Sequence, residues 1–512
     1  MTKTPREIAD LPGPRGLPII GNTLQVERRR LHRNVEDWSR TFGPFFRFKL
    51  GRRTLLGVSD HEALGALLRD RPDGFRRTRH LEAIGLEMGL TPGVFGANGE
   101  AWKRQRRMVM ASFDPSHVKA YFPSLLKVAQ RLRGRWQRAA HAGQAIELQP
   151  ELMRFTVDAI AGLAFGADVN TLESDDEIIQ QHLDKIFPAL FKRVFSTLPW
   201  WRWFPGAADR ELARSVAAVD AAIAGFIAQA RERLAADPQR RAQPPNLLEA
   251  MIVAAEATTE GHHGGNGAIS DREVAGNVLT MLLAGEDTTA NTLAWMIHLL
   301  HRHPEALRRA RDEVRALGVD STAFTMEQIA SLAWLEACAH ETMRLKPVAP
   351  FQVIEALRDT EVAGIRIPKG TAVWCVMRGD SVNERHFPEP QAFRPERWLG
   401  GGDAESPGSA SPALGPASSS PAKRVSMPFG AGPRVCPGRY LALLEIKMAM
   451  AMLLAHFEID AVGTPDGAEP AEHMSFTMSP LGLSMRLRVL GSPVAHPHQG
   501  FDKFSPNGSS GS

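Results

Sequence analysis

The feature that most constrains the fold is a long stretch without proline, which begins at Ser270 and ends before Pro304. Apolar residues recur there at three- and four-residue spacing, and Ser270 and Glu273 form a capping box at its start. A helix of about 32 residues that rises about 1.5 Å per residue is a rod of roughly 48 Å. Such a rod crosses a whole domain, so the rest of the chain must pack around it.

The middle of this predicted helix is weakened by residues 284–289, Ala-Gly-Glu-Asp-Thr-Thr. Gly285 and two threonines lower the helix propensity, and threonine hydroxyls can bond the carbonyl four residues back. Ala284 and Thr288 are four residues apart and share a face. A small side chain and a hydroxyl on one face leave room for a flat cofactor and a diatomic ligand. A core helix with an incidental kink is the alternative interpretation.

The remaining pattern predicts a mostly α chain with minor β structure. Helical spacing recurs at 120–140, 150–165, 208–235, 245–257, 304–316 and 326–345. Short strand signals predict hairpins at 45–58 and 361–367, the latter running on to 371–376, and a last pair within 474–489. Residues 400–422 are almost wholly Gly, Ser, Pro and Ala, so we expect a surface insertion within one domain of residues 1–505. Residues 506–512 are interpreted as a flexible tail or cloning scar.

The composition excludes several classes of protein. With 43% hydrophobic and 23% charged residues, the chain of 512 residues is globular, not disordered. A net charge of +4 is far from that of a dedicated nucleic-acid binder. The N-terminus has no apolar run, which predicts neither a signal peptide nor a transmembrane anchor. Three cysteines form no disulfide framework, so a reducing, cytoplasmic location is expected.

The most informative cysteine is Cys436, in the segment 429–438, Phe-Gly-Ala-Gly-Pro-Arg-Val-Cys-Pro-Gly. Three glycines and two prolines require a tight, irregular loop, and a helical run begins at Arg439. The N-terminus of a helix stabilises a thiolate, and a thiolate surrounded by amide donors suits an axial haem ligand. A buried, inert cysteine is the alternative, which we retain for Cys338 and Cys375.

This loop resembles the haem-binding signature of the cytochrome P450 family at Phe429, Gly430, Gly432, Arg434, Cys436 and Gly438. The resemblance implies the cytochrome P450 fold, with haem b between the long central helix and the cysteine loop. It also implies that Cys436 is the axial ligand of the haem iron. Three further motifs extend the resemblance from Trp102 to Gly438.

The weakened segment of the long helix resembles the oxygen-binding motif of the family. By this resemblance Ala284 borders the haem, and Thr288 positions a water beside the bound oxygen. Asp287 would relay protons from solvent, which makes Asp287 and Thr288 the expected catalytic pair. Glu286, about 100° around the helix from Asp287, is expected to point elsewhere.

Glu341 and Arg344 resemble the Glu-x-x-Arg motif of the family, and residues 395–398 resemble the segment that contributes a second arginine, Arg397. The implied triad is mostly buried and positions the cysteine loop. An ordinary surface ion pair between Glu341 and Arg344 is the alternative.

Trp102 and Arg106 resemble the Trp-x-x-x-Arg motif and would hold the haem propionates together with Arg434. The chain departs from the family at Ile354, where many relatives carry another propionate arginine. Either the anchoring differs here, or an arginine of an earlier segment compensates. The candidates are Arg76, Arg77 and Arg79.

The resemblance implies a small hydrophobic organic substrate and electrons from a separate protein of the ferredoxin or flavodoxin type. A basic cluster is either the docking patch for that acidic partner or a solvated helix face, and it comprises Lys103, Arg104, Arg106 and Arg107. The expected substrate pocket is apolar and contains Phe95, Met281, Gly285, Val353 and Leu481. Plain core packing explains each of these five residues equally well.

We therefore expect a soluble, bacterial-type monooxygenase of secondary metabolism that uses O2 and two supplied electrons to hydroxylate or epoxidise its substrate. A peroxygenase or isomerase of the same fold is one alternative, and a non-catalytic haem sensor is another. Neither alternative needs the acid and alcohol pair that this sequence retains at Asp287 and Thr288.

Overall fold

The computed structural model describes residues 4–166, 170–173, 178–196, 198–260, 269–399 and 421–491. The insertion predicted at 400–422 lies outside the described residues except for its last two positions. The tail predicted at 506–512 lies wholly outside them.

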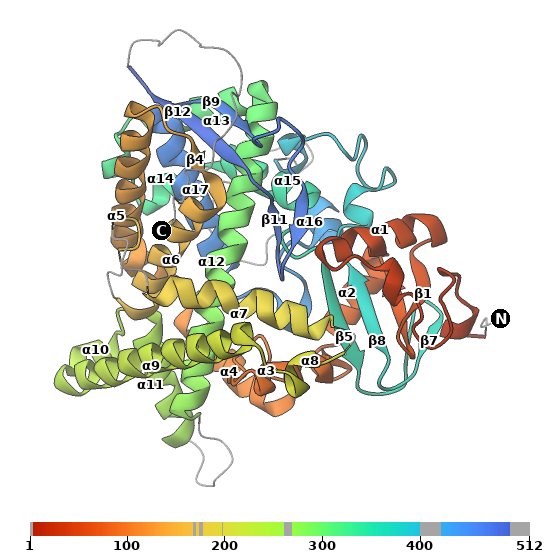
Figure 1. Ribbon diagram of the computed structural model, residues 1–512. Coiled ribbons are helices and arrows are strands. Elements are labelled where there is room, and N and C mark those ends of the chain that lie inside the picture. Colours follow the sequence, from red (N-terminus) through yellow and green to blue (C-terminus); the bar gives the residue numbers. More distant parts are fainter. Residues whose placement is uncertain are drawn as a thin grey trace, which may run out of the picture.

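The predicted rod is helix α12 (Asp271–Arg302), which runs through the middle of the molecule (Figure 1). The capping box is present, because the Ser270 hydroxyl accepts from the Glu273 amide and the Glu273 carboxylate accepts from the Ser270 amide. Most side chains of α12 are buried, and the helix packs on α6 (Leu148–Phe165), α15 (Ala333–Leu345) and α17 (Arg439–His456). The prediction that the chain packs around this rod is confirmed.

The other long helices follow the predicted periodicity closely, and they are α5 (Pro115–His141), α9 (Ala207–Ala236), α11 (Leu247–Glu260) and α13 (Pro304–Arg315). The helix predicted at 326–345 is wrong as one element. It divides into α14 (Met326–Ala330) and α15, because Leu332 has a non-helical backbone. Further helices were not predicted from the sequence: α1 (Leu31–Phe42), α2 (His61–Arg69), α3 (Arg79–Glu87), α4 (Gly99–Ser112), α7 (Ile178–Val194), α8 (Trp200–Trp203), α10 (Pro238–Ala242) and α16 (Pro421–Ser426).

A five-stranded sheet lies to one side of the helices (Figure 1). Its order is β1 (Phe45–Leu50), β2 (Arg53–Val58), β8 (Ala372–Val376), β5 (Phe351–Ala356) and β3 (Phe75–Arg77). β1 and β2 form the predicted hairpin, and β8 runs parallel to β2. Smaller sheets join β4 (Ile146–Glu147), β12 (Ser484–Val489) and β9 (Phe457–Gly463), then β10 (Glu472–Met474) with β11 (Met478–Pro480), and β6 (Thr360–Val362) with β7 (Ile365–Ile367).

The largest apolar core surrounds α12, and the five-stranded sheet has its own cores, one of which packs against α2. The predicted class, mostly α with minor β, is confirmed. Among the described residues, no helix combines the length and the apolar character needed to cross a membrane.

Candidate active site

The cysteine loop closes on itself and rests against the end of α2. The backbone amide of Cys436 donates to the carbonyl of Phe429 at 3.0 Å. Gly432 has a φ of +71°, and a Cβ there would lie 2.5 Å from the carbonyl oxygen of Leu68. Only glycine permits both this backbone conformation and this close approach. α17 begins at Arg439, so Cys436 precedes a helix N-terminus as predicted.

Opposing effects act on the pKa of the Cys436 thiol. Burial raises the pKa of Cys436, while the backbone N–H of Gly438 and then the charges of Arg106 and Arg439 lower it. The backbone N–H at the start of α17 thus favours the thiolate as predicted, but burial outweighs it and the net direction of the pKa is upward. A metal cation at the sulfur is the partner that deprotonates a thiol in such surroundings.

Four arginines lie beside this loop: Arg71, Arg77, Arg106 and Arg434. None of the four forms an ion pair with a carboxylate among the described residues. Burial and then the neighbouring charge of Arg71 lower the pKa of Arg77 and Arg434, that of Arg434 to about 9. The Nε atoms of Arg77 and Arg434 are buried without a hydrogen-bond partner. Arg71 is buried, and the other three arginines are half-buried. Guanidinium groups withdrawn from solvent in this way require anions. The two propionate carboxylates of haem b fit that requirement.

One candidate for the missing propionate arginine stands out. Arg76 pairs with Glu82, and Arg79 is an exposed side chain that pairs with Glu355. Arg77 is the remaining candidate, and its position on β3 pairs directly with Ile354 on β5. An arginine therefore stands on the strand adjacent to Ile354, at the paired position.

α4 holds the cysteine loop from the other side. The guanidinium of Arg106 donates to the carbonyl of Val435 at 2.8 Å. The guanidinium of Arg434 lies 4.6 Å from the ring centre of the buried Trp102 and donates to the carbonyl of Ala97 at 2.6 Å. The structure thus brings the three predicted propionate residues together.

The weakened segment of α12 presents an accessible face. Ala284, Gly285, Asp287 and Thr288 keep accessible surface, whereas Glu286 is buried as part of the opposite face. The Thr288 hydroxyl donates to the carbonyl of Ala284 at 2.7 Å, the back-bond that the sequence suggested. Gly285, which was expected in the substrate pocket, lies where α12 packs closely on α6. A Cβ at this position would lie 3.2 Å from the side chain of Ile160.

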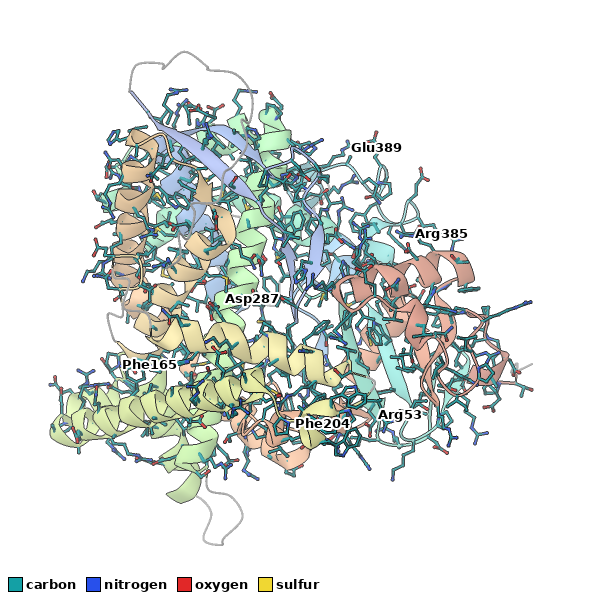
Figure 2. The ribbon with its side chains drawn as sticks, viewed as in Figure 1. Arg53, Phe165, Phe204, Asp287, Arg385 and Glu389 are labelled. Atoms are coloured by element: carbon teal, nitrogen blue, oxygen red, sulfur yellow. The ribbon has the colours of Figure 1, made fainter. Side chains whose placement is uncertain are left out.

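The Asp287 carboxylate lies near the centre of the molecule (Figure 2). One of its oxygens accepts from the Asn291 amide at 2.7 Å, and the other accepts from the Thr477 hydroxyl. Burial raises the pKa of Asp287, while these two donors lower it, and the net direction is upward. A raised pKa favours the protonated acid, which suits proton donation. Sequence reasoning missed Thr477, which is 190 residues away along the chain.

An aromatic cluster lies between α7, the loop before α4 and the turn between β10 and β11. Phe187 and Phe476 stack at 4.1 Å between ring centres, and Phe95 lies 5.8 Å from Phe476. Phe476 has a φ of 115°, which is rare for a bulky residue. Of the predicted pocket residues, Met281 is buried and Val353 is half-buried. Sequence reasoning missed Phe187 and Phe476.

The prediction that Leu481 lines the pocket is wrong. Leu481 lies on the turn after β11, where 55% of its surface is exposed to solvent. Its amide donates to the carbonyl of Ala471, which holds it at the surface.

The predicted ion network is assembled and buried. Arg344 donates to both oxygens of the Glu341 carboxylate at 2.8 Å, and Arg397 approaches it at 3.3 Å. The side chains of Glu341 and Arg344 have no exposed surface, so the surface-pair interpretation is wrong. The indole of Trp398 donates a further bond to Glu341.

The two arginines of this network also organise the segment after β8. Arg344 donates to the carbonyls of Ser381, Pro390 and Ala392, and Arg397 donates to those of Pro388 and Glu389. The network therefore acts directly on residues 381–392. Its predicted role in positioning the cysteine loop stays a prediction, since none of the network's hydrogen bonds among the described residues reaches residues 429–438.

The basic cluster of α4 is divided by its contacts. Arg104 pairs with Glu273 of α12 at 3.3 Å, and Arg106 bonds to the cysteine loop. Lys103 is partly exposed beside Glu100, and Arg107 is exposed. Only part of the predicted docking patch therefore faces solvent.

The fold and this site define a class of proteins that hold a flat, dianionic cofactor between a central helix and a cysteine loop. The sequence model of the family described as cytochrome P450 matches residues 11–486. The chain belongs to the cytochrome P450 family. It is accordingly an oxidoreductase of the haem-thiolate monooxygenase type, with haem b as its cofactor and an organic substrate, O2 and a redox partner.

The chain is 23% identical over 453 residues to cytochrome P450 3A13 of Mus musculus. The aligned region covers 88% of this chain and 85% of that protein. It is 26% identical over 486 residues to the chloroplastic cytochrome P450 97B2 of Glycine max, with 88% and 82% covered. The crystal structure of the cytochrome P450DA heme domain matches with a TM-score of 0.76 and 23% identity, over 95% of this chain and 98% of that one. The two named relatives are eukaryotic and lend no support to a bacterial origin or to secondary metabolism.

Proposed function

We propose that Cys436 is the axial thiolate ligand of the haem iron, and that this chain hydroxylates or epoxidises a small hydrophobic organic substrate. When bound, haem b supplies an iron centre that activates O2 with two electrons. The observation that carries the proposal is the set of arginines beside the cysteine loop, one buried and three half-buried, that lack a carboxylate partner among the described residues. Trp102, Arg106, Arg434 and Arg77 would hold the two propionates.

The acid and alcohol of α12 would deliver protons to the reacting oxygen. The Thr288 hydroxyl would accept and donate protons at the accessible face of the helix. Rotation of this hydroxyl away from the Ala284 carbonyl would free its proton for transfer. Asp287 would recharge that hydroxyl through water, since its carboxyl has a raised pKa and is anchored by Asn291 and Thr477. This pair favours a monooxygenase over a peroxygenase.

The substrate would lie against the aromatic cluster of Phe95, Phe187 and Phe476. Aromatic walls favour an apolar ligand, because burial of a polar group without a partner is unfavourable. The one charged group in ring contact with the cluster, within the described residues, is the guanidinium of Arg77, 4.1 Å from the ring centre of Phe95. Aromatic stacking across three separate elements also gives the pocket a defined shape.

Electrons would come from a separate acidic protein of the ferredoxin or flavodoxin type. Arg107 of α4 is exposed and follows Arg106, which bonds to the cysteine loop, and the half-buried Arg439 begins α17 directly after the loop. A basic face next to the proximal sulfur would steer an acidic partner to the short electron path.

The test is turnover under labelled O2. Apolar compounds are first screened for the spectral change that accompanies displacement of water from the haem, and the best compound is then incubated with electron donor and ¹⁸O2. The proposal predicts one labelled oxygen atom in the product and dependence on the electron donor. An unlabelled product, or equal turnover with hydrogen peroxide and no electron donor, would contradict it.

A further inference from the structure

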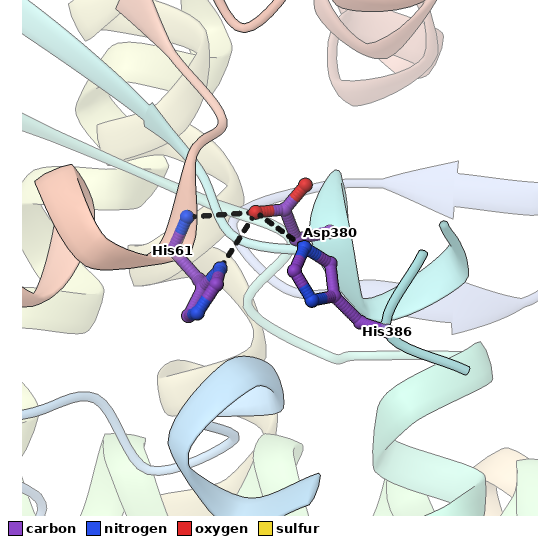
Figure 3. Close-up of side chains that lie close together, drawn as sticks. All are labelled: His61, Asp380 and His386. Carbon is purple, nitrogen blue, oxygen red and sulfur yellow. Dashed lines mark hydrogen bonds and ion pairs between the residues drawn. The ribbon is translucent and has the colours of Figure 1, made fainter. Parts of the chain in front are cut away.

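Two histidines and an aspartate meet at the start of α2, away from the candidate active site. The His61 ring nitrogen Nδ1 lies 2.8 Å from the Asp380 oxygen Oδ2, and Nε2 of His386 lies 3.6 Å from the same oxygen. The two imidazoles flank the carboxylate (Figure 3). One potential ligand atom from each residue lies within 4.8 Å of the other two.

This spacing suits a tetrahedral divalent metal. Zinc binds histidine nitrogen and carboxylate oxygen at about 2.0–2.2 Å, so its tetrahedral ligand atoms lie about 3.3 Å apart. The distances from Asp380 Oδ2 to His61 Nδ1 (2.8 Å) and to His386 Nε2 (3.6 Å) lie on either side of that value. Two imidazoles and one carboxylate select borderline metals over Mg²⁺ or Ca²⁺, which prefer oxygen ligands.

The backbone holds Asp380 in place before any metal binds. The His61 amide donates to Asp380 Oδ2 at 2.9 Å. A Cβ at the preceding Gly379 would lie 2.6 Å from the Cβ of Ser59, so the two segments are in close contact. The side chains of His61 and Asp380 are only 18% and 12% exposed, which leaves them little freedom.

His386 supplies the unused ligand. Its Nε2 is beyond hydrogen-bond distance of Asp380, and within the described part of the chain no other hydrogen bond to this side chain is formed. Its side chain is 28% exposed, so solvent and metal ions can reach it. The N-terminus of α2 carries about half a positive unit charge, which repels a cation at this position. The full negative charge of Asp380 is larger, so the net electrostatic effect attracts the cation.

A metal at this position would join two segments that hold the cysteine loop. α2 begins at His61, and its other end abuts Gly432 of the loop. The segment that carries Asp380 and His386 is fixed at Ser381 by the buried Arg344. We propose that His61, Asp380 and His386 bind one zinc-class divalent ion, with water in the fourth position, and that this ion fixes α2 to the segment after β8.

The test is zinc binding to the haem-loaded, chelator-treated protein, measured by equilibrium dialysis with metal analysis and by thermal unfolding. His386→Gln removes an accessible ligand without removing a hydrogen bond, and His61→Gln removes a second ligand. His141→Gln, which changes an exposed histidine at the end of α5, is the matched control. The parent and the control are expected to bind one equivalent of Zn²⁺ and to unfold at a higher temperature with zinc.

Both ligand variants are expected to bind zinc at least about tenfold more weakly, and His386→Gln is expected to lose the thermal response. Anomalous scattering at the zinc edge is expected to place one peak among the three side chains. No stoichiometric binding by the parent would overturn the proposal. Equal binding by His386→Gln would also overturn it, because the zinc would then occupy other histidines.

Discussion

Arg77 and Ile354 are direct partners in the antiparallel pairing of β3 with β5. β5 contains no arginine, whereas the neighbouring strand β3 carries Arg77 directly opposite Ile354. The Nε of Arg77 is buried without a hydrogen-bond partner, and burial together with the charges of Arg71 and Arg434 lowers its pKa. An anion beside Arg77 would relieve this unfavourable burial of charge.

Replacement of Arg77 is therefore expected to weaken haem retention. A charge-assisted hydrogen bond contributes about 1.5–3 kcal/mol, so haem should leave Arg77→Met about 10- to 100-fold faster than the parent. The measurement is transfer of haem to an apoprotein acceptor. Arg79→Met, which removes an exposed arginine that pairs with Glu355, is the control. Equal transfer rates for Arg77→Met and the parent would rule out this anchor.

Removal of the Thr288 hydroxyl is expected to separate electron consumption from product formation. In Thr288→Ala the proton supply at the accessible face of α12 is lost, so product formation should fall by about 10²-fold, the lower end of the contribution of a positioned proton donor. Reduced cofactor consumed and peroxide released are measured beside product. Thr292→Ala removes the same kind of back-bond one turn later and should keep its coupling. Unchanged coupling in Thr288→Ala would show that the hydroxyl has no part in proton delivery.

Neutralising the buried carboxylate of the ion network is expected to destabilise the protein. Glu341→Gln leaves the guanidinium of Arg344 buried without a counter-charge, for which a loss of about 3–5 kcal/mol in the free energy of unfolding is typical. Urea unfolding of the haem-loaded protein measures this loss. Glu305→Gln, in an exposed pair with Arg308, should change little. A similar stability for both variants would mean that the network contributes no more than a surface pair.

Glu445 of α17 is expected to make stability depend on pH. Burial raises its pKa from 4.5 to about 8, and the Thr289 hydroxyl only partly opposes this. The folded state therefore holds a proton that the unfolded state releases between these two values. Stability should fall as pH rises from about 5 to about 8, by up to about 1.4 kcal/mol for each pH unit crossed.

The corresponding measurement is the free energy of unfolding of the parent and Glu445→Gln at several pH values. The amide does not ionise, so the variant should gain on the parent as pH rises. Glu384→Gln, at an exposed position, controls for a general charge effect. Parallel pH profiles for the parent and Glu445→Gln would place the carboxyl in a more polar environment than the structure indicates.

The sequence predicted the long and strongly periodic elements, because burial on one face of a helix leaves a regular apolar pattern. It did not predict α7, where Pro188 interrupts the pattern and yet lies inside the helix. It also did not predict α1, although Leu31, His32, Val35 and Glu36 are buried on one side of that helix. Local propensity is weak in such segments, and packing against the rest of the chain decides their structure.

The candidate site was predictable where its residues share a short motif, as for Glu341 with Arg344. It was not predictable where two distant segments meet. The pairing of Arg77 with Ile354 depends on the register of two strands, and the bond from Thr477 to Asp287 depends on a turn that reaches across to α12. Leu481 shows the opposite error, since an apolar residue beside a predicted pocket turns outward at the end of a strand.

The central claim is that the sulfur of Cys436 binds the haem iron. The most direct measurement is the carbon monoxide difference spectrum of the reduced, haem-loaded protein, compared between the parent and Cys436→Ser. Ligation by Cys436 predicts an absorption maximum at the position characteristic of a thiolate for the parent, and loss of that maximum in Cys436→Ser with haem still bound. A parent spectrum without this maximum, or a Cys436→Ser variant that keeps it, would show that Cys436 is not the ligand of the iron.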